Sequence, residues 1–205
     1  MSAFLGPIHY WLYRKIELQE QLVDQVIILA QNEGINDLKQ TLLSKYGEFD
    51  RRPLEEIIDG SNIHGWLQDK VAGSEYKLAI GVTTLVHKDV KLMEKLKEIF
   101  SSVGEEKGSA LLQEEGLTLE SIYQNILDSL LDGMPCDHVV SIVKTTDDEL
   151  VWKTVHCVHA PYWNEIGGDV NHYYELREAY LNGFAKALGV SFEVVGEKTY
   201  AIKKA

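Results

Sequence analysis

Residues 138–158 read HVVSIVKTTDDELVWKTVHCV, and this stretch decides the fold class. Two runs rich in β-branched residues, His138–Lys144 and Leu150–Val158, flank the polar segment 145–149. This pattern predicts a β-hairpin that turns around Asp147. Residues whose numbers sum to about 294 should then face each other across the two strands.

The segment that follows predicts one helix and a second hairpin. A loop containing Pro161 leads to a helical pattern from about Val170 to Leu188, which a glycine ends. Strands 190–195 and 198–203 should then pair across Gly196-Glu197, because glycine at the first turn position suits a type II′ turn. Together the two hairpins predict a four-stranded antiparallel sheet with one inserted helix.

Upstream of this sheet, apolar residues recur at helical spacing. We expect one long helix from Pro7 until Gly34, and helical structure again from Asn62 to about Ser102. The predicted fold class is α+β, with a helical N-terminal two thirds packed on the C-terminal sheet. With 205 residues, the chain is expected to form a single domain, 1–205, made of a helical part, 1–134, and an α+β part, 135–205.

Composition narrows the expected partners and location. The formal net charge of −12 argues against nucleic acid and against an anionic membrane surface. No apolar run reaches the ~18 residues of a membrane helix, and no basic and apolar leader opens the chain. We therefore expect a cytoplasmic protein with a small-molecule partner, in which the two cysteines stay reduced.

A short motif occurs twice. Residues 8–12 and 63–67 share the pattern I-H-x-W-L, which places His9 and His64 at the starts of the two long predicted helices. The positive end of a helix favours a neutral imidazole, the form that binds a metal or accepts a proton. If the helices lie side by side, the rings can face each other and contact a cofactor. Alternatively, the apolar residues are core anchors and each histidine bonds to a loop carbonyl.

A second cluster gathers at one end of the first predicted hairpin: Cys136, His138, His156, Cys157 and His159. Strand alternation should place Cys157 and His159 on one face and His156 on the other. Thiolate and imidazole are ligands of zinc and iron, so the cluster predicts a transition-metal site, or a metallocofactor such as haem. The alternative is structural, because free cysteines are often buried.

Cys157 is also a candidate nucleophile, with His159 as its catalytic base. A neighbouring histidine can lower the pKa of a thiol, and Asp137 or Asp169 could orient that histidine. The aromatic residues that follow, Trp163, Tyr173 and Tyr174, suit the wall of a ligand pocket.

The order of elements from about residue 100 onward resembles a known group. The landmarks are segments 104–108, 132–135 and 196–198, together with Cys157 after the second strand. This order is similar to that of the 4-vinyl reductase-type small-molecule-binding domain and its relative, the 2-amino-thiazoline-4-carboxylate hydrolase family. The resemblance implies an internal ligand pocket. Where the group has a further cysteine near the final strand, this chain has Tyr200.

Three functional hypotheses follow. The first is a protein that binds a small ligand, a metal or a metallocofactor between the helices and the sheet. The second is a cysteine-dependent hydrolase of a small cyclic substrate of the thiazoline or amide type. The third is a non-catalytic interaction module whose histidines are structural.

Overall fold

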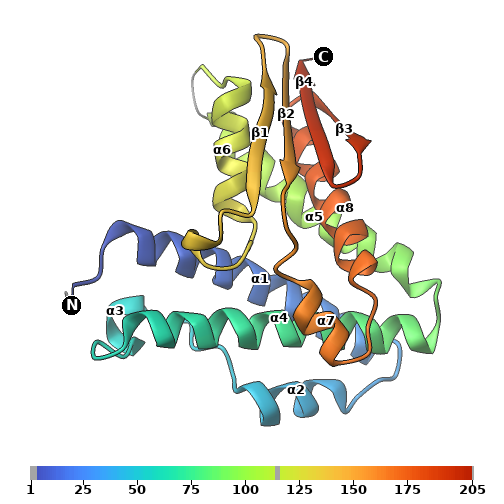
Figure 1. Ribbon diagram of the computed structural model, residues 1–205. Helices are drawn as coiled ribbons and strands as arrows, with labels where there is room; N and C mark the ends of the chain where they lie inside the picture. The colour runs from blue at the N-terminus through green and yellow to red at the C-terminus, as the bar shows by residue number, and fades with distance from the viewer. Residues whose placement is uncertain (1–3, 114–115, 205) are drawn as a thin grey trace.

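The computed structural model describes residues 4–113 and 116–204 and confirms the α+β class. Eight α-helices and four strands lie in this part of the chain (Figure 1). In chain order, the elements are α1 (Pro7–Asn32), α2 (Leu38–Tyr46), α3 (Leu54–Ile57), α4 (Ile63–Lys88), α5 (Leu92–Ala110), α6 (Leu119–Ser129), β1 (Val140–Thr145), β2 (Glu149–Thr154), α7 (Ala160–Glu165), α8 (Val170–Ala187), β3 (Val190–Gly196) and β4 (Thr199–Lys204), with single 3₁₀ turns at Leu111–Gln113 and Pro135–Asp137.

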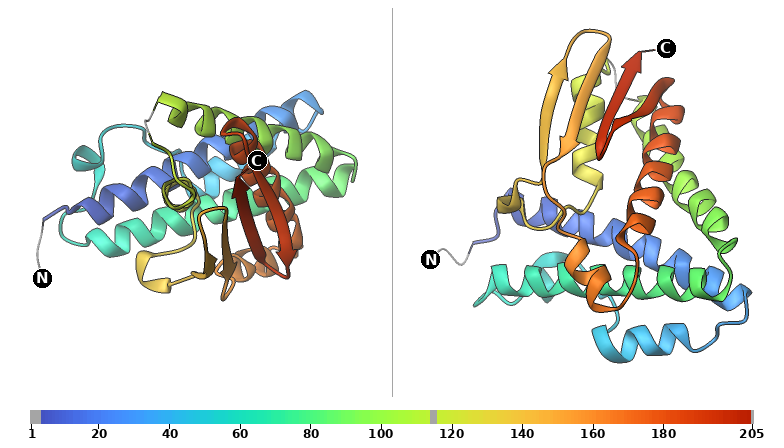
Figure 2. Two further views of the ribbon diagram at one scale, coloured as in Figure 1. Left: turned by 90° about the horizontal axis from the view of Figure 1, so that it is seen from above. Right: turned by 45° about the vertical axis from the view of Figure 1, so that its right-hand side comes forward.

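The two longest helices, α1 and α4, lie side by side and point in the same direction at the base of the molecule (Figures 1 and 2). Contacts between them keep a nearly constant sequence offset: 55 residues for His9 and His64, 56 for Gln19 and Glu75. The repeated I-H-x-W-L motif has the same offset. The two copies therefore meet because the helices that carry them pair in parallel from their first turns.

The sheet stands on this pair, with α6, α5 and α8 on one side of it (Figure 2). Its strand order is β1-β2-β4-β3, and all neighbours are antiparallel. Val140 pairs with Thr154 and Ile142 with Trp152, which is the register expected for the first hairpin. The second strand ends at Thr154 rather than Val158, so the Cys157 segment is a loop and strand alternation does not apply to it.

The second hairpin turns one residue later than expected. Gly196 pairs with Thr199, so Glu197 and Lys198 form the turn, and Lys198 adopts a positive φ of 47°. The type II′ prediction with glycine in the first turn position was wrong, because an irregularity between Val194 and Gly196 shifts the register. The helical structure expected from Asn62 to about Ser102 is present and consists of two helices, with a break between Lys88 and Leu92.

Buried side chains form two clusters. The larger cluster joins the second half of α1 and α4 to α5, α6, α8 and the inner face of the sheet, and includes Trp152, Trp163 and Tyr200. The smaller cluster lies at the N-terminal ends of α1 and α4, around Leu12, Ile16 and Leu67. Among the described residues, no helix is long and apolar enough to cross a membrane.

Candidate functional site

The imidazoles of His9 and His64 face each other. Their Nε2 atoms lie 3.3 Å apart and their ring centroids 5.4 Å apart. His9 is the third residue of α1 and His64 the second of α4. The expectation that side-by-side helices would bring these two rings together therefore agrees with the geometry.

A backbone contact determines where the proton of His9 lies. The Gly6 N–H donates to His9 Nδ1 over 2.9 Å, so Nδ1 is an acceptor. A neutral His9 then carries its proton on Nε2 and donates it to His64 Nε2. Each ring is thus oriented by a hydrogen bond, and in the neutral pair one proton lies between the two Nε2 atoms.

The histidine pair opens into a groove of about 490 Å³. Its wall is mainly apolar, and a pocket with an apolar wall and a few convergent polar groups is the usual form of a small-ligand site. Cys136 is on the same wall, so the structure brings it together with the helix histidines. The lining residues are Ile8, His9, Leu12, His64, Gly65, Leu67, Gln68, Met134, Pro135 and Cys136.

The segment from Asp132 to His138, here called the 132–138 loop, closes one side of this groove. Gly133 has a φ of +70°, and a Cβ atom on it would lie 2.4 Å from the Asp137 carboxylate, so only glycine fits. That carboxylate accepts the Met134 N–H over 2.7 Å. The backbone of the loop is therefore held by its own side chains, which fixes the direction of Cys136 and Asp132.

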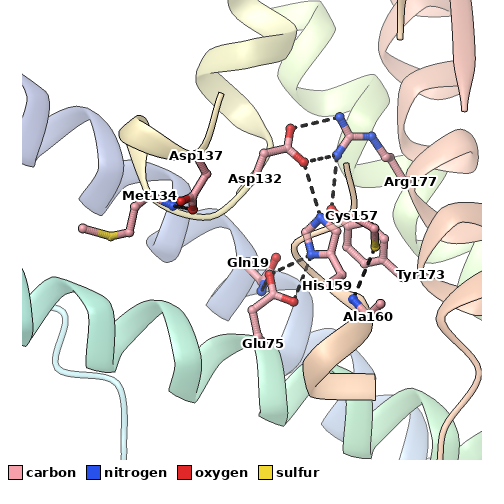
Figure 3. Close-up of polar contacts among 10 residues, drawn as sticks. All are labelled: Gln19, Glu75, Asp132, Met134, Asp137, Cys157, His159, Ala160, Tyr173 and Arg177. Carbon is pink, nitrogen blue, oxygen red and sulfur yellow. Dashed lines mark hydrogen bonds and ion pairs between the residues drawn. The ribbon is translucent and has the colours of Figure 1, made fainter. Parts of the chain in front are cut away.

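Asp132 begins a buried chain of charged groups (Figure 3). Arg177 of α8 donates to its two oxygens over 2.6 and 3.0 Å. His159 lies between two acids: its Nε2 is 3.4 Å from Asp132, and its Nδ1 is 3.1 Å from both oxygens of Glu75 on α4. Gln19 of α1 donates to the same Glu75 carboxylate. The chain thereby ties the helical base to α8 and to the 132–138 loop.

This buried row of charged groups also sets the protonation states of its members. Burial alone would lower the pKa of His159, but the charge of Glu75 and the hydrogen bond with Asp132 outweigh it and raise that pKa to about 9. Burial likewise opposes ionisation of Asp132, but Arg177 and His159 hold its pKa well below its usual range. His159 is therefore an imidazolium at neutral pH, and it has no free nitrogen for a general base.

Cys157 lies at the edge of these buried charged groups, and its thiol is half-buried. Its Sγ accepts the Ala160 N–H over 3.3 Å, at the start of α7. Burial raises the pKa of the thiol, but the neighbouring Tyr174 hydroxyl, the Ala160 N–H and the His159 charge together lower it below its ordinary value. These contacts, rather than proton transfer to His159, make the thiol more acidic than an ordinary cysteine.

The other predicted site residues are dispersed. His138 and His156 are exposed, and the strand end that was expected to align them with Cys157 is a loop. Tyr173 stacks on His159 with centroids 3.7 Å apart, while Trp163 is fully buried in the larger core cluster. Within residues 4–113 and 116–204, no three His, Cys, Asp or Glu side chains are close enough to hold a metal ion.

Sequence reasoning missed the acids that actually contact His159. Asp137 caps its own loop and Asp169 caps α8, whereas Glu75 and Asp132 hold the imidazole. The position of Glu75 could have indicated its role. This residue falls within the apolar stripe of its helix, where a charged residue needs a partner.

Comparison with known proteins adds no relative, since no family model, no curated protein and no solved structure matches this chain. The resemblance of residues 100–205 to the vinyl reductase-type domain stays a prediction.

Proposed function

We propose that the protein binds a divalent transition-metal ion of the zinc type between His9 and His64, with a small ligand completing the coordination in the adjoining groove. The observation that carries this proposal is the 3.3 Å separation of the two Nε2 atoms at the mouth of an open groove. Two nitrogens bound to one tetrahedral ion at 2.0–2.1 Å lie about 3.3 Å apart, so the rings already have the spacing of two ligands.

The proton between the rings opposes metal binding, but the free-energy cost of moving it is small. To bind through Nε2, His9 must move its proton to Nδ1 and give up the Gly6 N–H contact. Losing one such hydrogen bond costs about 1 kcal/mol, against the 10–16 kcal/mol that a complete structural zinc site releases. Gly6 is the N-cap residue of α1, so the lost contact is confined to the start of the helix.

Two imidazoles leave two of the four coordination positions of a tetrahedral ion free. Cys136 lines the same groove and is exposed, so it is the candidate third ligand, although its side chain would have to move to reach the ion. Water or a substrate donor would take the remaining positions, as in metal sites that act on a ligand. Haem suits the pair less well, because rings in contact leave no room for an iron porphyrin between two axial nitrogens.

The decisive experiment is a Co²⁺ and Zn²⁺ titration of the full chain at pH 7.5, monitored by cobalt d–d absorption and calorimetry. His9→Asn and His64→Asn should each weaken binding by about 10- to 100-fold or abolish it. His87→Asn, which changes an exposed histidine at the other end of α4, is the matched control and should bind like the wild type. A wild type without metal binding, or equal binding by all variants, would overturn the proposal.

The same titration separates the other hypotheses. A thiolate band with Co²⁺ that disappears in Cys136→Ser would identify the third ligand. A cysteine-dependent hydrolase would instead lose activity on alkylation of Cys157, and the imidazolium state of His159 means that its base must be another group. An interaction module would show neither response.

A further inference from the structure

Lys15 of α1 is a buried lysine without a charged partner in contact. The residue is only 5% exposed, although lysine is almost never buried to this extent unless it is paired. Among the described residues, no carboxylate forms an ion pair or hydrogen bond with its Nζ. The amine instead lies over the Trp11 ring, 3.5 Å from the centroid.

Lys15 lines a second hollow, of about 190 Å³, which shares Met134 and Pro135 with the histidine groove as a common wall. Here the wall is again mostly apolar, and Trp11 is one of its members. Lys15, Asp132 and His138 are its ionisable members. The volume admits a molecule of a few non-hydrogen atoms.

Charged groups from three elements face Lys15. Asp128 of α6 accepts the Trp11 N–H over 2.7 Å, and Asp132 is paired with Arg177 of α8. Burial lowers the pKa of Lys15 to about 8; Asp132 and Asp128 oppose this shift, and Arg177 adds to it. A sizeable fraction of the amine is therefore uncharged and nucleophilic near neutral pH.

We propose that Lys15 adds to the carbonyl carbon of a small, uncharged aldehyde or ketone in this pocket and forms a reversible imine. The amine lone pair forms the C–N bond while the carbonyl π electrons move to oxygen, which takes a proton from water. Loss of water from this carbinolamine then gives the protonated imine. Overall, amine, carbonyl and one proton yield iminium and water.

The surroundings favour this product and this class of ligand. An iminium is a cation. The Trp11 face lies against the amine and Asp132 lines the pocket, while the charge of Asp128 acts from outside the lining. The mostly apolar wall would disfavour an anionic ligand, which would have to give up its hydration on entry. Apolar side chains on the remaining wall suit a short alkyl group.

The test is reductive trapping of the full chain with propionaldehyde and cyanoborohydride, followed by peptide mass spectrometry. At pH 7, Lys15 should be propylated at least about tenfold faster than the exposed Lys91 and Lys153, because more of its amine is neutral. Its rate should level off above about pH 8, the pKa of its amine, whereas an ordinary lysine amine gains reactivity up to about pH 10. These lysines are internal controls that need no variant.

Two variants and a second reagent complete the design. Lys15→Arg should remove the fast-labelled site and leave Lys91 and Lys153 unchanged. His64→Asn should leave Lys15 labelling intact, so the result is independent of the metal proposal. Glyoxylate, an anionic aldehyde, should label Lys15 less than propionaldehyde does. The proposal is wrong if Lys15 reacts no faster than the exposed lysines or follows their pH dependence.

Discussion

At the scale of single residues, the buried chain through His159 governs the protein's response to pH. Glu75 and Asp132 stabilise the imidazolium in the folded state only, so the folded pKa, about 9, exceeds the ordinary value of 6.5. A group whose pKa is raised by folding makes its full contribution to the free energy of unfolding at pH values below its unfolded pKa. That contribution is lost as the pH rises through the folded value.

We therefore expect the free energy of unfolding to fall between about pH 6.5 and pH 9, by up to about 3 kcal/mol from this residue. Urea denaturation at intervals across this range measures it. His159→Asn removes the titrating group and keeps a hydrogen-bonding side chain, so its curve should lack this fall. Parallel curves for wild type and variant would show that His159 does not titrate as described.

At the scale of elements, α5 and α8 cross at backbone contact. A Cβ atom at Gly104 would lie only 2.1 Å from the Tyr180 carbonyl oxygen. The crossing positions α8, and α8 carries Arg177 and Tyr173 to the chain around His159. A small residue at position 104 is thus a condition for the site as well as for the core.

Gly104→Ala should destabilise the fold despite the better helix propensity of alanine. The propensity gain is about 1 kcal/mol, whereas separating two packed helices to admit a methyl group costs about 1–3 kcal/mol or more. Ser102→Ala, at an exposed position of the same helix, is the control and should change the unfolding free energy little. Equal stability of the two variants would contradict the close crossing.

At the scale of the whole molecule, the division of the core into two clusters predicts uneven stability. The histidine groove lies on the smaller cluster, around Leu12 and Leu67, while the second half of α1 belongs to the larger cluster. Fewer buried apolar contacts mean a lower free energy of local opening.

Native-state hydrogen exchange should therefore show faster exchange for amides at 12–16 than for those at 22–27, both of which lie in α1. Zn²⁺ should slow the first group and leave the second unchanged, because a ligand stabilises the state to which it binds. Uniform protection along α1, or a zinc effect equal in both groups, would contradict this division.

Local patterns along the chain were sufficient for several features. The change of periodicity from helical spacing to alternation near residue 138 predicted the α+β class, and the polar turn around Asp147 predicted the register of the first hairpin. These features depend on residues that are close together in the sequence, so they can be predicted from the sequence alone. The repeated I-H-x-W-L motif predicted that His9 and His64 could meet.

Only the tertiary structure decided the rest. The parallel pairing of α1 and α4 brought the two histidines together, and the 132–138 loop placed Cys136 on the wall of their groove. The packing of α8 on α5 brought Arg177 to Asp132. Glu75 and His159 are 84 residues apart, and no local pattern relates them. In the sequence, Lys15 is indistinguishable from other lysines in helices. Its burial becomes visible only in the structure, where residues of the 132–138 loop line the same hollow. Burial and charge pairing are properties of the assembled molecule, because they depend on which distant segments exclude water from a group.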